Sequence, residues 1–130
     1  MRKDTQNWIK TAEYDLETAE DIFKIGRYPY VIFMCHLAIE KLLKAHVTEV
    51  TQSEPAKTHN LVYLVQKAGL DVPQDTMDFL GDLSNGSVPT RYPDDFDKFV
   101  GEYTKKEAEE YLRLTKEAFQ WLRQHQNLKE

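Results

Sequence analysis

The sequence predicts an all-α protein, an up-and-down bundle of four to five antiparallel helices with a long loop before the last helix. Apolar residues recur at steps of three and four along most of the chain, which is the helical period. Five glycines and five prolines are few for the many tight turns of an all-β fold. A chain of 130 residues with 41% hydrophobic residues suits one domain, residues 1–130, built around a single core.

The first helix is predicted from Trp8 onward, and it has one apolar stripe, formed by Trp8, Ala12, Leu16, Ala19 and Phe23. Gly26 is expected to end it, because glycine tolerates the left-handed backbone conformation. The triplet Arg27-Tyr28-Pro29 is then typical of a turn between helices, since proline is accepted in a first helical turn.

The second helix is predicted from about Tyr30 to about Val50, as the central element of the bundle. Its first half is apolar almost all round, and its second half is amphipathic. His36, Glu40 and Lys44 follow one another at steps of four, so their side chains stand one above another. Such a row is typical of a helix-stabilising ion pair, and it also suits the orientation of a phosphate or an incoming arginine.

Two shorter helices are expected next. The third has Thr58 as its N-cap and ends at Gly69, which places His59 in its first turn. The fourth covers about Gln74 to about Ser84 and is followed by an Asn-Gly turn.

The last helix begins with the most specific local signal in the chain, a capping box in which Thr104 and Glu107 satisfy each other's backbone donors. Ahead of it, Ser87 to Tyr103 shows no helical periodicity. Long ordered loops in small domains often have a functional role, so the segment PTRYPDDF, residues 89–96, becomes a candidate site.

Composition excludes several classes of function. A net charge of −5 argues against broad, sequence-independent binding of nucleic acid, which needs a basic face. Cys35 is the one cysteine, so no intramolecular disulfide forms, and its apolar surroundings are typical of a core residue. The four histidines lack the spacing of metal ligands, so we expect no metal and no cofactor. We see no signal peptide and no apolar run of membrane-spanning length, so we expect a cytoplasmic protein without a membrane partner.

Four segments, in this order, resemble the HEPN (higher eukaryotes and prokaryotes nucleotide-binding) domain family: WIKTAEYDLETAEDIF at 8–23, CHLAIEKLLKAH at 35–46, KTHNLVYLV at 57–65 and TRYPD at 90–94. The resemblance covers nearly the whole chain. It implies a helical bundle that commonly homodimerises. Many prokaryotic members are encoded beside a minimal nucleotidyltransferase, and the pair acts as a toxin–antitoxin or nucleotide-handling module. Tyr14 and Trp121 lie outside the main apolar stripes of their helices. Aromatic residues in such positions are consistent with a surface that binds a partner, and equally with side chains that cover the ends of loops.

Active HEPN ribonucleases have an arginine followed four to six residues later by a histidine, and they cleave RNA without metal. This sequence departs from that pattern, because no arginine is followed by a histidine in that window. After Arg91 the window holds Phe96, Asp97 and Lys98. Whether the chain is an enzyme is therefore open, and the departure favours a protein without ribonuclease activity.

Matched residue by residue, the family resemblance implies a polar cluster for nucleotide or RNA, formed by Glu40, Lys44, His59, Arg91 and Tyr92. We expect the long loop to fold back so that Arg91 meets Glu40, with His59 nearby.

Three functions stay open at this point. The first is a HEPN dimer that acts with a minimal nucleotidyltransferase partner and binds nucleotide or RNA, without a complete ribonuclease motif. The second is a metal-independent ribonuclease, the toxin of a toxin–antitoxin pair, in which His59 or His36 takes over from another helix. The third is a scaffold whose polar residues satisfy loop ends. The acidic charge and the missing histidine favour the first.

Overall fold

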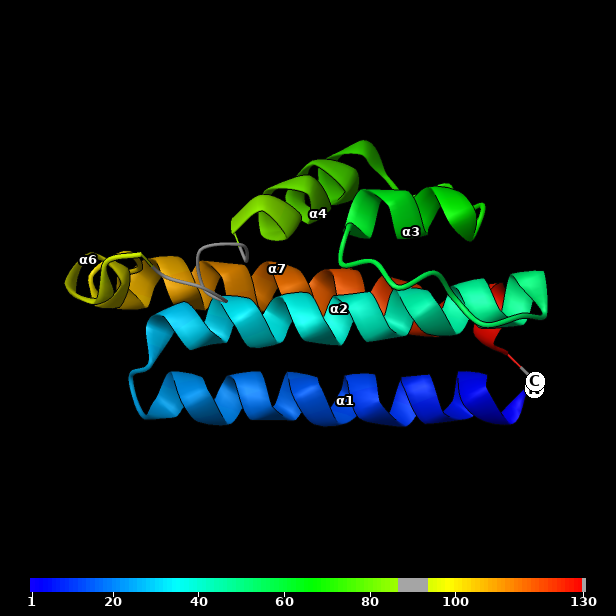
Figure 1. Cartoon of the computed structure of the whole chain (residues 1–130), viewed down its shortest axis with the longest axis horizontal. Helices are drawn as coiled ribbons and strands as arrows, with labels where there is room; N and C mark the ends of the chain where they lie inside the picture. The colour runs from blue at the N-terminus through cyan, green and yellow to red at the C-terminus, as the bar shows by residue number, and fades with distance from the viewer. Residues whose placement is uncertain (87–93, 130) are drawn as a thin grey trace.

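Three long helices form the body of the protein. The computed structural model describes residues 1–86 and 94–129, and within them every regular element is helical. The long helices are α1 (Lys3–Lys24), α2 (Tyr28–Thr51) and α7 (Lys105–Gln124), which run alongside one another (Figure 1). The predicted all-α bundle is confirmed.

Shorter helices cover one side and one end of this body. Helices α3 (Leu61–Lys67) and α4 (Gln74–Gly86) pack on each other and on α2, on the side of α2 away from α1 (Figure 1). Helix α6 (Phe96–Val100) lies at the end of the body where α7 begins, and the 3-10 helix η1 (Gln126–Leu128) follows α7 (Figure 1).

Helix α2 is the central element because it contacts α1, α7, α3, α4, α6 and η1. Its first turn accepts Pro29, and its C-cap is Gln52, which adopts the left-handed conformation with φ of 56°. Between these ends it contributes fully buried apolar side chains to the core on several sides, among them Ile32, Ile39, Leu42 and Leu43. This continuous burial explains why its sequence shows a weaker stripe than α1 or α7.

The third helix begins later than its sequence pattern predicts, and Thr58 is not its N-cap. Asn60 is the cap, because its side-chain oxygen accepts a hydrogen bond from the backbone N–H of Tyr63. Thr58 instead accepts from the backbone N–H of Asn60 through its hydroxyl. His59 therefore lies in the connection before α3 and not in its first turn.

The described part of the connection before the last helix, residues 94–103, contains a short helix that its lack of periodicity did not predict. Asp95 caps α6 by accepting from the backbone N–H of Lys98, so a five-residue helix occupies part of the expected loop. The predicted capping box of Thr104 and Glu107 is confirmed, and it opens α7 directly afterwards.

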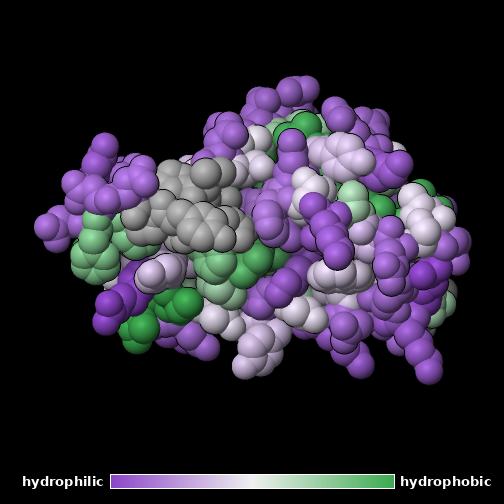
Figure 2. All heavy atoms as spheres, in the orientation of Figure 1, coloured by the Kyte–Doolittle hydropathy of each residue, from purple (hydrophilic) through white to green (hydrophobic). Residues whose placement is uncertain are grey.

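The face of the protein shown in Figure 2 is mainly hydrophilic, and hydrophobic side chains gather at the α6 end of the body. The exposed large apolar residues include Tyr14, Ile25, Phe96 and Val100. Among the described residues, no helix is both long and apolar enough to cross a membrane.

Candidate functional site

A row of polar side chains is buried in the middle of α2. His36, Glu40 and Lys44 are one helical turn apart, and each is less than a tenth exposed. Charged and polar groups are rarely buried to this degree unless they are paired, because leaving water costs several kcal/mol per ion. The partners of this row therefore decide what it does.

Glu40 joins the basic groups of this row to a neighbouring loop. Its Oε2 accepts a hydrogen bond from Lys44 Nζ at 3.1 Å, one turn further along α2. Its Oε1 lies 2.8 Å from Nδ1 of His59, which comes from the connection before α3. Nδ1 of His36 is 3.6 Å from the same Oε1, which is an electrostatic contact beyond hydrogen-bond distance.

His59 is held at two points. Its ring nitrogen Nδ1 is bound to Glu40, and its backbone carbonyl accepts from Nε2 of His36 at 2.8 Å. A carbonyl only accepts, so the proton of His36 is on Nε2. A carboxylate likewise accepts, so the proton of His59 is on Nδ1. The two contacts fix both the backbone and the ring of His59.

The remaining nitrogen of His59, Nε2, is available at the surface. The His59 side chain is 64% exposed, and no described residue forms a hydrogen bond to Nε2. A neutral imidazole whose Nδ1 is protonated presents an acceptor at Nε2, and a protonated one presents a donor there. Chemically, this arrangement can bind a phosphate oxygen or move a proton at one defined atom.

Lys44 has a second neighbour on α1. Its ammonium lies 5.6 Å from the centre of the Trp8 ring, within the range of a cation–π contact. Lys44 is thus enclosed by Glu40 on one side and an aromatic face on the other. Its position suits neutralisation of Glu40 more than direct contact with a ligand.

Three of the five residues in the predicted cluster therefore come together, namely Glu40, Lys44 and His59. Arg91 and Tyr92 lie outside the described residues, so the expected contact between Arg91 and Glu40 stays a prediction. His36 belongs to the cluster although the sequence-based set omitted it. The spacing of four residues between His36 and Glu40 could have indicated that His36 belongs to the cluster.

A second histidine of α2 has a structural role that the sequence did not indicate. His46 is fully buried, and its Nε2 donates to the carbonyl of Leu122 near the end of α7 at 2.8 Å. Burial in these surroundings lowers the pKa of His46 to about 4, so the ring is neutral at physiological pH. The only signal for this contact lay in tertiary packing, because Leu122 is far away in the sequence.

Cys35 is buried in α2, as predicted for a core residue. Burial raises the pKa of its thiol to about 12, which keeps it protonated and unreactive. Among the described residues, no group of three or more histidine, cysteine or acidic side chains is placed to hold a metal ion.

Comparison with known proteins agrees with this architecture. The sequence profile of the HEPN domain matches residues 5–125, which is nearly the whole chain. The chain belongs to the HEPN domain family. No curated protein matches the sequence.

Two crystal structures resemble this HEPN domain over more than nine tenths of its length. One is TT1696 from Thermus thermophilus, with 26% sequence identity, a TM-score of 0.80, and coverage of 93% of this chain and 97% of that one. The other is ST0689, an archaeal HEPN homologue, with 26% identity, a TM-score of 0.74, and coverage of 95% and 97%. The polar cluster of Glu40, Lys44 and His59 lies inside the matched HEPN region.

Proposed function

We propose that this chain is a cytoplasmic HEPN binding module, a homodimer that acts with a minimal nucleotidyltransferase partner. Its ligand is a nucleotide or RNA, bound at the cluster of Glu40, Lys44 and His59, together with Arg91 and Tyr92. It works without a complete ribonuclease motif. The observation that carries the proposal is the exposed ring of His59, held in a fixed orientation over the buried carboxylate of Glu40.

The contacts of His59 support a binding role in two ways. The Glu40 carboxylate selects the Nδ1-protonated tautomer, so the orientation of Nε2 is set before a ligand arrives. Preorganisation of this kind lowers the entropy lost on binding. Burying Glu40 and Lys44 is also costly, and an apolar pair of similar volume would serve a purely structural role as well or better.

The binding test uses fluorescence anisotropy with a labelled single-stranded RNA and, in parallel, a labelled adenine nucleotide. His59→Asn is the informative variant, because its amide nitrogen can still donate to Glu40 while the ring nitrogen Nε2 is gone. His125→Asn is the matched control, made at a half-buried histidine near η1. We expect binding to weaken about tenfold in His59→Asn and to persist in His125→Asn. Equal binding by both variants, or no binding by the wild-type protein, would overturn the proposal.

The same geometry favours a second candidate, a metal-independent ribonuclease. In this reaction His59 Nε2 accepts the proton of a ribose 2′-hydroxyl, and the 2′-oxygen forms a bond to the adjacent phosphorus. The bond from phosphorus to the 5′-oxygen breaks, and that oxygen takes a proton from water. The products are a 2′,3′-cyclic phosphate and a 5′-hydroxyl. Cleavage with these end groups that is lost in His59→Asn and kept in His125→Asn would make this the better function.

The expected contribution of Arg91 has its own test. A double-mutant cycle of Arg91→Ala and Glu40→Gln measures whether the two residues interact. We expect a coupling of about 1 kcal/mol or more in thermal or denaturant unfolding, as for residues in one ion-pair network. Additive effects, with unchanged ligand binding in Arg91→Ala, would remove Arg91 from the site and favour the scaffold role.

The assembly proposal rests on family membership and is tested separately. Light scattering at micromolar concentration should give the mass of a dimer, which is twice 15.3 kDa. Co-purification with the product of a neighbouring gene for a minimal nucleotidyltransferase should give a stable complex. A monomeric protein that forms no complex with the nucleotidyltransferase would contradict both expectations. It would not affect the ligand-binding test.

A further inference from the structure

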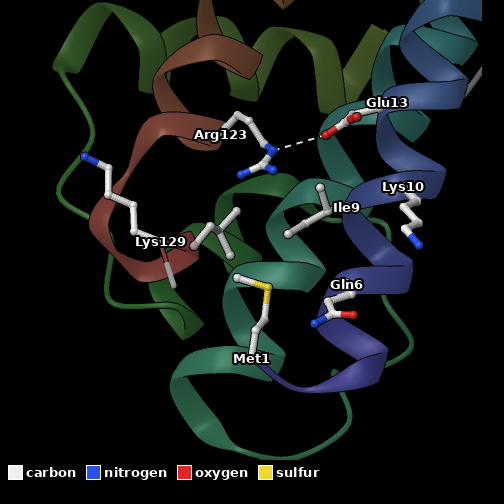
Figure 3. A pocket seen from close by; sticks show the side chains of 8 residues that line it. Met1, Gln6, Ile9, Lys10, Glu13, Arg123 and Lys129 are labelled. Carbon is white, nitrogen blue, oxygen red and sulfur yellow. Dashed lines mark hydrogen bonds and ion pairs between the residues drawn. The ribbon is translucent and has the colours of Figure 1, made fainter.

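A second concave region lies on another part of the protein, where the first half of α1 meets the end of α7 and η1. Its volume is about 680 Å³, within the range of small-molecule sites. It is lined by Met1, Gln6, Ile9, Lys10, Glu13, Arg123, Leu128 and Lys129 (Figure 3). None of these residues belongs to the polar cluster of α2. We call this region the basic cleft.

The lining of the basic cleft is positive in a protein whose net charge is −5. Lys10, Arg123 and Lys129 supply three cations, and Glu13 is the single carboxylate. Three other cavities among the described residues have a smaller excess of cations or none. One between α1 and α7 has four cations against three carboxylates. One near Tyr111 is lined by three acidic residues and no cation, and one at the start of α7 pairs Lys105 and Lys106 with two glutamates. The basic cleft therefore attracts anions against the overall field of the protein.

The cations of the basic cleft are largely uncommitted. Glu13 engages only Nε of Arg123, at 3.1 Å, and the terminal nitrogens of the guanidinium point over the cleft (Figure 3). Lys10 and Lys129 are exposed at its two rims, and neither forms an ion pair with a described residue (Figure 3). Both ammonium groups point outward in Figure 3, on opposite sides of the cleft, and their flexible stems allow them to turn toward an anion held by Arg123.

Three apolar residues, Met1, Ile9 and Leu128, form the floor of the basic cleft. Met1 is 37% exposed and its side chain lies near Ile9 (Figure 3), whereas Ile9 and Leu128 are themselves at most 5% exposed, so Met1 supplies most of the accessible apolar surface. An anionic group held at the rim would thus have an apolar surface directly below it. We propose that the basic cleft is a second binding site, for a small phosphate monoester with an apolar or aromatic body. The phosphate is held by Lys10, Arg123 and Lys129, and the body packs on Met1 and on the exposed edges of Ile9 and Leu128.

The test is a titration of the full chain with phenyl phosphate and, separately, inorganic phosphate, followed by the backbone amide signals in nuclear magnetic resonance spectra. We expect both probes to shift the signals of Gln6, Ile9 and Lys10, and phenyl phosphate to bind several-fold more tightly because its ring covers the apolar floor. Equal affinities would overturn the role of the floor. Absence of localised shifts for both probes would overturn the site.

Variants make the test specific, because some should weaken and others should strengthen the binding of phenyl phosphate. Lys10→Ala/Lys129→Ala should weaken phenyl phosphate about fivefold or more, and higher salt should shrink this difference. Glu13→Gln should strengthen binding about twofold, because it removes a repelling charge and still accepts a hydrogen bond from Arg123. Lys105→Ala/Lys106→Ala removes the same charge elsewhere and should leave affinity unchanged. If this control weakens binding as much as the cleft variant does, the attraction is non-specific and the proposal is wrong.

Discussion

Helix α2 contains two buried histidines that make the same contact in different surroundings. His36 and His46 are both fully buried, and the Nε2 of each donates to a distant backbone carbonyl at 2.8 Å. His36 thereby fastens the connection before α3, and His46 fastens the end of α7. Nδ1 of His36 lies near the carboxylate of Glu40, whereas Nδ1 of His46 lies 3.4 Å from the side-chain amide of Asn127.

The different surroundings of the two histidines give them different roles: His46 makes a structural contact, and His36 belongs to the candidate site. The ring of His46 lies 5.5 Å from the His125 ring, and burial keeps the ring of His46 uncharged. The His36 end adds Glu40, Lys44 and the exposed ring of His59, so charge and a solvent-facing nitrogen are present together. One hydrogen-bond geometry therefore serves both regions, and the carboxylate of Glu40 is what distinguishes the proposed site from the structural contact.

The largest expected effect comes from removing that carboxylate. Glu40→Ala should lower the free energy of unfolding by about 3 kcal/mol, because it leaves the buried ammonium of Lys44 without its partner. Chemical denaturation measures this loss. Glu17→Ala, at an exposed position of α1, is the control and should change stability by less than about 0.5 kcal/mol. Similar small losses in both variants would mean that the pair contributes little.

The second effect belongs to His46 and depends on pH. Its folded pKa of about 4 lies below the ordinary value of 6.5, so the unfolded chain binds the proton more readily. The stabilising contribution is complete above pH 6.5 and is lost as the pH falls toward 4, by up to about 3 kcal/mol.

His46→Gln isolates this contribution, because its amide nitrogen can donate to Leu122 but does not titrate. Denaturant unfolding of both proteins between about pH 7 and about pH 4 should show a smaller acid loss in the variant. Parallel stability curves for the two proteins would contradict the assignment to His46.

The smallest effect concerns the stability of the site histidine. His59→Ala should cost about 1 kcal/mol, because Glu40 loses one hydrogen-bond donor and keeps Lys44. His59→Asn should cost less than His59→Ala because a donor to Glu40 remains. Thermal unfolding compares the two variants. If His59→Asn proves the less stable of the two, the Nδ1 contact does not hold the connection as described.

The sequence predicted those features that depend on neighbours along the chain. The α7 capping box needs only Thr104 and Glu107, and the row from His36 to Lys44 follows from the helical period. The contact of Glu40 with His59 joins a helix to a loop, and only the family resemblance anticipated that grouping.

The sequence did not predict features that depend on a choice between competing N-caps or on contacts between residues far apart in the chain. Thr58 and Asn60 are both good caps, and the choice between them depends on where the chain leaves the loop. The burial of His46 depends on α7, which returns from the far end of the chain, so no local pattern indicated it. The basic cleft is likewise assembled from the two ends of the described chain, and its charges look ordinary in the sequence.

The attachment of His59 at both its backbone and its ring has a consequence for the preceding residues 52–58. Because the far end of this segment is anchored on α2, its own length and composition need not define the position of the imidazole. Lengthening a flexible segment adds only a small closure entropy. The connection is therefore a natural place for an inserted tag or reporter that leaves the geometry around Glu40 intact.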